Sequence, residues 1–161
     1  MLIILEGADG GGKTTLAAKL VKDLAASYYH SGGPKTPEEM QMRINELEIM
    51  AHSKDFVIVD RVPWISEMIY PYAFGRKPIL TVKQHLENLK LPQKIIFCRP
   101  DGPMQMSLEL KAHKPKEHTE NVIKNHERII DLYDALFQRI HHIRYDYRKT
   151  NYAILLKKLK G

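Results

Sequence analysis

The sequence predicts an α/β fold of three layers, in which a five-stranded parallel sheet carries helices on both faces. Short apolar runs alternate along the chain with longer segments of helical periodicity, and this alternation is typical of parallel strands joined by crossover helices. The chain has 161 residues, of which 43% are hydrophobic, so it can bury the core of one domain. We therefore expect a single domain over residues 1–161, without repeats or linkers.

The first strand is expected at residues 2–5, an apolar run with two isoleucines that is typical of a strand buried on both faces. The stretch Gly7-Ala-Asp-Gly-Gly-Gly-Lys-Thr14 follows, with the spacing of a P-loop: a glycine, four residues, then Gly-Lys-Thr. A helix over residues 15–26 comes next, so the motif has the strand–loop–helix context that it requires. An ordinary glycine-rich turn is the alternative.

The chemistry of this motif is the binding of a polyphosphate. Glycines let successive backbone N–H groups turn inward, and the following helix presents its positive N-terminal end to the phosphates. We expect Lys13 to reach the β- and γ-phosphates of ATP and the Thr14 hydroxyl to hold Mg²⁺. The complete expected ATP-binding set is Gly7, Asp9, Gly10, Gly11, Gly12, Lys13, Thr14 and Thr15.

A brief β-prone stretch over residues 27–30 is the second expected strand, and a helix over residues 36–52 follows it. The start of this helix has three agreeing signals. Thr36 is a suitable N-cap, Pro37 occupies the first helical position, and Glu39 completes a capping box.

The clearest central strand covers residues 56–59 and ends directly in Asp60-Arg61. A short helix is expected over residues 64–70, and an irregular stretch over residues 71–78 follows. The next helix, over residues 81–89, is expected to turn Val82, Leu86 and Leu89 inward.

The C-terminal part of the chain continues the alternation. A buried strand over residues 94–98 ends in Arg99. Beyond it we expect a helix over residues 103–112, a long amphipathic helix over 119–140, a strand over 143–147 and a basic amphipathic helix over 151–160.

In parallel sheets of this kind, ligands bind at the carboxyl ends of the strands. That rule brings the P-loop, His30, Asp60-Arg61 and Arg99 to one edge of the sheet. Residues that are distant in sequence thus form one candidate site.

Asp60 and Arg61 suit phosphoryl transfer, which needs a group near the acceptor oxygen and a cation over the developing charge. Asp60 could bind Mg²⁺ through water or accept the proton of the acceptor hydroxyl; a helix-capping aspartate paired with Arg61 is the alternative. Arg99 could clamp a phosphate with two hydrogen bonds, or be an ordinary solvated arginine. The expected catalytic set is Lys13, Asp60, Arg61 and Arg99.

Aromatic residues gather after Asp60-Arg61, and such side chains can stack on a nucleobase. Tyr72, Phe74 and Arg76 lie in the irregular stretch and are the better candidates for base contact, whereas Tyr70 is expected in the core. Tyr147-Arg148 could flank the adenine of ATP; an ordinary turn is the alternative interpretation.

Two segments of the sequence resemble motifs of a known family. Glu6-Gly-Ala-Asp-Gly-Gly-Gly-Lys-Thr-Thr15 resembles the P-loop of thymidylate kinases, and Val57-Ile-Val-Asp-Arg61 with Ser66 and Tyr70 resembles their aspartate–arginine strand end. Small phage-type deoxynucleoside and deoxynucleotide kinases share both features. The resemblance implies a P-loop kinase fold of three layers over nearly the whole chain.

The resemblance also implies residue roles. Asp9 matches the acid that contacts the acceptor sugar, Arg61 the arginine that holds the acceptor phosphate, and Arg76 an arginine that contacts the base. Asp60 matches a carboxylate near the metal, so Thr14 and Asp60 are the expected Mg²⁺ ligands. The expected substrate-binding set is Asp9, His30, Asp60, Arg61, Trp64, Tyr72 and Arg76.

Three departures concern the acceptor side. The second strand ends in His30-Ser-Gly-Gly-Pro34 instead of an arginine–glutamate–proline–glycine run, and Ser66 stands one residue further from Asp60-Arg61. The arginine-rich lid of the family is replaced by Lys111, Lys114 and Lys116, so a short lid over residues 111–118 is a hypothesis, with a solvated loop as its alternative.

The net charge of +6 and the pI near 9.3 favour anionic partners, either nucleotides or nucleic acid. Cys98 is the only cysteine, which excludes an internal disulfide and a cysteine-based zinc site. No apolar run is long enough to span a membrane, and the N-terminal strand does not resemble a signal peptide, so we expect a cytoplasmic protein. Its oligomeric state is open, a homodimer included.

The sequence therefore favours an ATP- and Mg²⁺-dependent kinase of a deoxynucleoside monophosphate or a deoxynucleoside. One alternative acceptor is a hydroxyl of nucleic acid, either a terminus or a base such as hydroxymethyluracil in phage-type DNA modification. A second alternative is a P-loop ATPase without a small-molecule acceptor, in which Asp60 would serve the metal.

Overall fold

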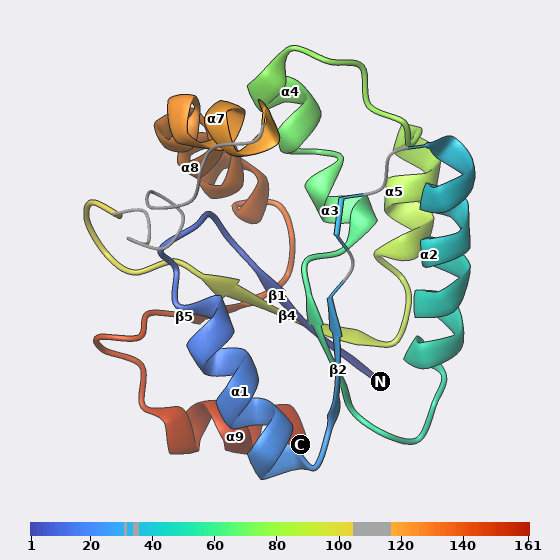
Figure 1. Cartoon of the computed structure of the whole chain (residues 1–161). Helices are drawn as coiled ribbons and strands as arrows, with labels where there is room; N and C mark the ends of the chain where they lie inside the picture. The colour runs from blue at the N-terminus through green and yellow to red at the C-terminus, as the bar shows by residue number, and fades with distance from the viewer. Residues whose placement is uncertain (31, 34–35, 105–116) are drawn as a thin grey trace.

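The sheet is the centre of the molecule (Figure 1). The computed structural model describes residues 1–30, 32–33, 36–104 and 117–161. Within these residues the strands form one sheet of five, all parallel, in the order β2-β3-β1-β4-β5. The strands are β1 (Leu2–Glu6), β2 (Ser27–His30), β3 (Val57–Asp60), β4 (Gln93–Cys98) and β5 (Ile143–Tyr145). The predicted five-stranded parallel sheet is confirmed.

Helices cover both faces of this sheet (Figure 1). One face packs against α1 (Lys13–Leu24) and α9 (Tyr152–Lys160), with alternate strand residues such as Ile3 and Leu5 turned toward them. The intervening residues, such as Leu2 and Ile4, turn to the opposite face. That face is covered by α2 (Pro37–Ala51), α3 (Pro63–Ser66), α4 (Tyr70–Phe74), α5 (Val82–Asn88), α7 (Glu117–Lys124) and α8 (His126–Phe137). The central strands β1, β3 and β4 are thus largely buried on both sides, as the apolar runs of β1 and β4 predicted, whereas β2 at the edge of the sheet is mostly exposed.

Helix α1 begins two residues earlier than predicted. Gly12 precedes it in the left-handed conformation (φ 81°), so Lys13 is the first helical residue. At the other end, Ala25 also turns left-handed (φ 49°) and stops the helix at Leu24. Helix α2 begins as predicted, with the complete capping box of Thr36 and Glu39 and a proline in the first turn.

The single helix predicted over residues 64–70 is two short helices instead, α3 and α4, which a turn separates. A proline occupies the first turn of each one, where its missing N–H costs no helical hydrogen bond. Gly75 (φ 68°) then ends α4 in the left-handed conformation. The irregular stretch was therefore predicted too early, because Tyr72 and Phe74 lie on α4.

Helix α5 presents the opposite face from the one predicted. Val82 is 74% exposed and Leu86 is 57% exposed, while His85 is buried. The Nδ1 of His85 donates to the backbone oxygen of Trp64 at 2.8 Å, so a polar contact with α3 orients this short helix. Leu89, after the helix, packs against the core as expected.

The long helix predicted over residues 119–140 is also divided. Asn125, with φ −107° and ψ 16°, separates α7 from α8, and α8 ends at Phe137. The strand predicted over residues 143–147 stops at Tyr145, because Asp146 starts a turn closed by the Thr150 hydroxyl. Most of the predicted helix over residues 103–112 and most of the predicted lid over 111–118 lie outside the described residues.

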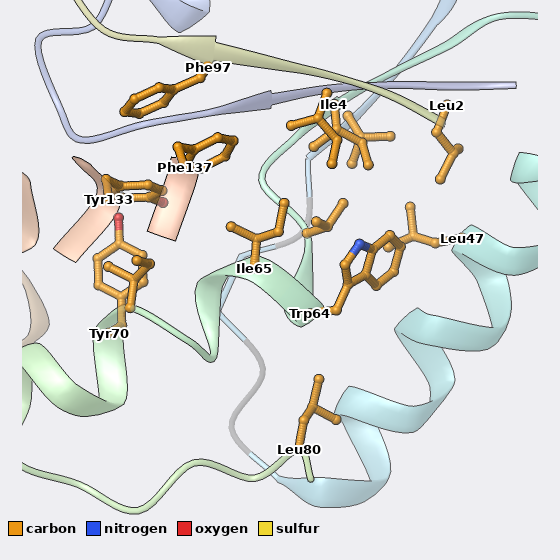
Figure 2. Close-up of a cluster of buried hydrophobic side chains, with 14 of the residues drawn as sticks. Leu2, Ile4, Leu47, Trp64, Ile65, Tyr70, Leu80, Phe97, Tyr133 and Phe137 are labelled. Carbon is orange, nitrogen blue, oxygen red and sulfur yellow. The ribbon is translucent and has the colours of Figure 1, made fainter. Parts of the chain in front are cut away.

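The larger of the two cores lies between the sheet and α2, α3 and α8. Its largest fully buried side chains include Trp64, which lies beside Leu47, and Tyr133, which lies beside Tyr70 and Phe137 (Figure 2). In the described part of the chain, no helix has both the length and the apolarity to cross a membrane.

Candidate active site

The P-loop follows β1 and lies against the end of β4. A Cβ atom added to Gly7 or Gly11 would come within 2.5 or 2.4 Å of the Cys98 carbonyl oxygen, so only glycine allows this approach. Gly7, Gly10 and Gly12 have positive φ angles, which L-residues adopt at a cost. The loop is therefore folded into its compact shape by its own glycines and by the adjacent strand.

Lys13 lies inside the loop. Its buried ammonium donates to the backbone oxygens of Gly7 at 2.8 Å and Ala8 at 3.0 Å. Burial lowers its pKa to about 8, with the charge of Arg61 acting in the same direction and the carboxylates of Asp9 and Asp60 opposing it. Thr14 and Thr15 follow on the first turn of α1, and both are exposed.

Arg61, which follows β3, reaches back over the P-loop. Its Nη2 donates to Asp9 Oδ1 at 3.2 Å and to the Gly7 backbone oxygen at 3.3 Å. The guanidinium also lies over the ring of Tyr70, 5.5 Å from its centroid. Its buried Nε has no hydrogen-bond partner among the described residues.

The carboxylate of Asp9 stays charged in this setting. Burial would raise its pKa, but the charges of Arg61 and Lys13, the Arg61 hydrogen bond and the charge of His126 together hold that pKa below its usual value. His126, on α8, also contacts the Asp9 backbone oxygen through Nε2 at 3.0 Å. Asp9 and Arg61, 52 residues apart in sequence, thus form a half-buried ion pair.

Asp60 is the last residue of β3, and its two carboxylate oxygens differ. Oδ2 accepts the hydroxyl of Tyr28 at 3.3 Å and lies 3.7 Å from Nδ1 of His30. Oδ1 is buried and has no partner in the described part of the chain. A buried carboxylate oxygen without a donor is costly, and a metal-bound water or an acceptor hydroxyl would satisfy it.

Tyr28 is a site residue that the sequence analysis missed. Tyr28 and His30 lie two residues apart on β2 and therefore share one face of the strand, and their rings are parallel with centroids 6.5 Å apart. Burial and the neighbouring carboxylate of Asp60 raise the pKa of the Tyr28 hydroxyl. Side chains two residues apart on a strand point to the same face, so the expected site residue His30 could have indicated Tyr28 as well.

Arg99 is engaged elsewhere. Nε and Nη2 donate to both oxygens of Asp134 at 2.9 and 3.0 Å, and Nη1 donates to the backbone oxygens of Pro100 and Gly102. The hydrogen bonds to Asp134 raise its pKa, so it is a permanent cation. A phosphate would have to compete with Asp134 for the Nε and Nη2 donors of Arg99.

Three residues of the expected substrate-binding set follow Asp60-Arg61 in the chain, and they have different surroundings. Trp64 is fully buried in the core, with its Nε1 unpartnered among the described residues (Figure 2). Arg76 forms a two-point ion pair with the buried Glu67, at 2.7 and 3.3 Å. Tyr72, 54% exposed on α4, is the one that presents its ring to solvent.

Tyr147, followed by Arg148, lies beside the P-loop next to Gly12. A Cβ atom at Gly12 would come within 3.1 Å of the Tyr147 ring, and the Arg148 guanidinium lies 5.2 Å above that ring. Asp101 fixes the surrounding loops by accepting Arg144 at 2.8 Å and Lys149 at 2.7 Å. This pair therefore borders the loop, as an adenine-flanking pair would.

Glu6 is the second residue whose importance the sequence did not reveal. Its side chain is fully buried at the end of β1, and burial raises its pKa to about 7. It accepts hydrogen bonds from the Val62 backbone and the Tyr133 hydroxyl. The signals in the sequence were its place at the end of an apolar strand and its place at the start of the P-loop resemblance, and neither gave it a role.

No protein-family model matches this chain, and no curated protein sequence does. Solved structures do match. The chain is 25% identical to the YorR protein of Bacillus subtilis, whose structure holds phosphorylated GDP; the match covers 99% of this chain and 97% of that one, with a TM-score of 0.67. The fold is that of the deoxynucleoside and thymidylate kinases.

Two further structures support this assignment of the fold. Deoxyadenosine kinase from M. mycoides, solved with bound dATP, is 16% identical, covers both chains fully and has a TM-score of 0.55. Thymidylate kinase from Candida albicans is also 16% identical, with 99% of this chain and 89% of that chain covered and a TM-score of 0.58. At this identity the likeness concerns the fold, and the chemistry depends on the site.

Proposed function

We propose that the protein is an ATP- and Mg²⁺-dependent kinase that phosphorylates a deoxynucleoside monophosphate or a deoxynucleoside. The observation that carries the proposal is the contact between Arg61 and Asp9 over the P-loop, next to Asp60, whose buried Oδ1 has no hydrogen-bond partner among the described residues. A phosphate-binding loop, a cation and a carboxylate with a free oxygen are the groups that in-line phosphoryl transfer needs.

On the donor side, the glycine loop and the start of α1 would hold the ATP phosphates. Lys13 would exchange the Gly7 and Ala8 carbonyls for phosphate oxygens, which is a short movement of a flexible side chain. The exposed Thr14 hydroxyl and the free Oδ1 of Asp60 fit Mg²⁺, the latter through water. The metal, when bound, neutralises charge on the transferred phosphate.

On the acceptor side, Asp60 Oδ1 would accept the hydrogen bond of the attacking hydroxyl or hold the metal's water, and Arg61 would bind the acceptor phosphate or the charge that develops during transfer. Asp9, which pairs with Arg61, would contact the sugar of the acceptor. Tyr72 is our candidate for base contact, because its ring is exposed. Arg99, Trp64 and Arg76 are engaged in structural contacts, and we give them no direct role.

The test is transfer of label from γ-labelled ATP with Mg²⁺ to a panel of deoxynucleosides, deoxynucleoside monophosphates and oligonucleotides. We expect label in a small nucleotide product, and Lys13→Ala should lower this transfer by about 10²-fold or more. Label only in oligonucleotides would favour the nucleic-acid hydroxyl as acceptor. ATP hydrolysis that no acceptor changes would favour the ATPase alternative and contradict the proposal.

The names of two structural neighbours, deoxyadenosine kinase and thymidylate kinase, support both acceptor classes equally. The acceptor panel decides between them. A monophosphate acceptor needs a second phosphate-binding cation, and Arg61 fills that role in the proposal, whereas a nucleoside acceptor would leave Arg61 to the transferred phosphate alone.

A further inference from the structure

A buried carboxylate that the proposed reaction does not use lies at the end of β1. Glu6 is 0% exposed and pairs with Phe97 in the β1–β4 register. Burying a carboxylate costs several kcal/mol unless its oxygens are hydrogen-bonded, and an apolar side chain would fill the same space without that cost. Stability alone therefore does not explain a glutamate here.

Both oxygens of Glu6 are hydrogen-bonded. Oε1 accepts the Val62 backbone N–H at 2.8 Å, and Oε2 accepts the Tyr133 hydroxyl at 2.9 Å. The first bond joins β1 to the segment after β3, and the second joins it to α8. Both partners are themselves buried.

The bond to Val62 holds a strained backbone. Arg61 has a φ of 66°, in the left-handed region that costs a non-glycine residue about 1–2 kcal/mol. The amides on either side of its Cα are fixed to consecutive residues of β1, because Arg61 N–H donates to the Leu5 oxygen at 3.0 Å and Val62 N–H donates to Glu6. This turn directs the guanidinium back to Gly7 and Asp9.

Tyr133 holds Glu6 in turn. It is 1% exposed on α8, with its ring edge-on to Tyr70 at 6.4 Å and stacked on Phe97 at 6.2 Å. Figure 2 shows these rings gathered at one end of the core, away from Trp64. Packing of the Tyr133 ring therefore holds the hydroxyl in place, and its hydrogen bond orients the Glu6 carboxylate whose other oxygen faces the Val62 amide.

We propose that Glu6 and Tyr133 are a positioning pair, which holds Arg61 over the phosphate loop through the Val62 amide. The inference rests on the proposed kinase function, because Arg61 matters only if it acts in that reaction. Both residues act through the backbone of Arg61, so they are positioning residues and Arg61 is the group that meets the substrate.

The first experiment compares two substitutions of Glu6. Glu6→Leu removes the acceptor of the Val62 N–H, and a displaced Arg61 should lower kcat by about 10²-fold while the Kd for ATP changes less than about 3-fold. Glu6→Gln keeps an amide oxygen for Val62, and the Tyr133 hydroxyl can rotate to accept from its amide. It should restore kcat to within about 5-fold of the wild type. Equal activity of the leucine variant and the wild type would overturn the inference.

Tyrosine substitutions give a milder comparison that preserves the core. Tyr133→Phe removes one hydroxyl and should lower kcat by about 10-fold. Tyr145→Phe is the matched control, because Tyr145 is also a buried tyrosine but belongs to the other core, and it should leave kcat unchanged. Equal losses in the two variants would show a general packing effect and overturn the inference.

A double-mutant cycle with Arg61→Ala separates positioning from plain structural support. In that background Glu6→Leu, or Tyr133→Phe if the leucine variant does not fold, should cause less than about a 2-fold further loss of kcat. Losses that multiply would mean that the pair acts independently of Arg61.

Amide hydrogen exchange at Val62 is a readout that does not need catalysis. We expect slow exchange in the wild type and in Glu6→Gln, and exchange at least about 10-fold faster in Glu6→Leu. If the wild-type protein phosphorylates no acceptor, the proposed function fails by itself, and the exchange result still decides the positioning pair. Unchanged exchange at Val62 in Glu6→Leu would overturn the pair whatever the activity.

Discussion

At the scale of single residues, the site depends on how one arginine is held. Arg61 is half-buried, has a strained backbone and is paired with Asp9, and its side chain connects the end of β3 to the P-loop. A cation placed there before the substrate binds needs no rearrangement during transfer, which is the main source of electrostatic catalysis. The ionisable groups around it are the buried Glu6 and Lys13 and the half-buried Asp9, and the pKa of each is shifted by burial and by the charge of Arg61.

Asp9→Asn tests the role of the acid inside the loop. The change keeps the shape of the side chain but removes the charge that pairs with Arg61, so acceptor kcat/KM should fall by about 10–100-fold while the Kd for ATP stays within about 3-fold. Initial-rate kinetics and equilibrium binding of ATP measure the two quantities. Asp23→Asn, at an exposed carboxylate of α1 that accepts the Tyr152 hydroxyl, is the control that should change neither. An ATP affinity that falls with the acceptor kinetics would contradict the separation.

The raised pKa of Glu6 predicts a dependence of stability on pH. Burial raises this pKa from 4.5 to about 7, although the Val62 N–H, Arg61, Tyr133 and Lys13 oppose the shift. Between those pH values the folded protein binds more protons than the unfolded chain, so the contribution of Glu6 to the free energy of unfolding falls as pH rises. Relative to Glu6→Gln, the wild type should lose on the order of 1 kcal/mol per pH unit within this window. Urea unfolding of both proteins at pH 5, 6 and 7 measures the difference, and parallel curves would contradict the assignment.

At the scale of elements, tertiary contacts decided what the local patterns left open. The capping box of α2 and the proline at its first position predicted its start correctly, because those signals act within one turn. Helix α5 has an equally complete capping box, yet its buried face was predicted wrongly. Its seven residues contain too few apolar positions to define a stripe, and the bond from His85 to Trp64 orients it instead.

This orientation can be tested by substitution on the two faces of α5. Val82→Lys and Leu86→Gln lie on the exposed face and should change the free energy of unfolding by less than about 0.5 kcal/mol each. His85→Ala removes a buried ring and leaves the Trp64 oxygen without its donor, so it should cost about 1–3 kcal/mol. Chemical denaturation of the three variants gives the comparison. A larger loss for Val82→Lys than for His85→Ala would contradict the observed face.

At the scale of the whole molecule, the sequence was sufficient to predict the sheet and the residues that lie together at the carboxyl ends of its strands. Buried parallel strands have continuous apolar runs, and a P-loop after the first of them fixes which edge binds the ligand. The strand order β2-β3-β1-β4-β5 puts β3 and β4 on either side of β1. The last residues of these two strands, Asp60 and Cys98, therefore border the P-loop.

Side-chain partners could not be predicted in the same way. Arg99 and Arg76 have the residue type and position of phosphate and base ligands, but their pairing with Asp134 and Glu67 depends on helices packed from elsewhere in the chain. Trp64 follows the site in sequence and is nevertheless buried, because α3 turns it into the core. The contacts of Glu6 with Val62 and Tyr133 span 56 and 127 residues, a distance at which no local pattern gives a signal.

Binding of ATP should stabilise the whole fold, because the P-loop joins β1, β4 and α1. A ligand that binds only the folded state at about 100 times its Kd adds about 2.7 kcal/mol, and for a chain of this size that raises the Tm by about 5–10 °C. Lys13→Ala should reduce the increase to less than about 2 °C, because the buried ammonium is the group that would meet the phosphates. Lys19→Ala, which removes an exposed lysine of the same helix, should keep the full increase. Thermal unfolding of the three proteins with and without ATP and Mg²⁺ measures these shifts, and equal shifts in all three would place the nucleotide elsewhere than the P-loop.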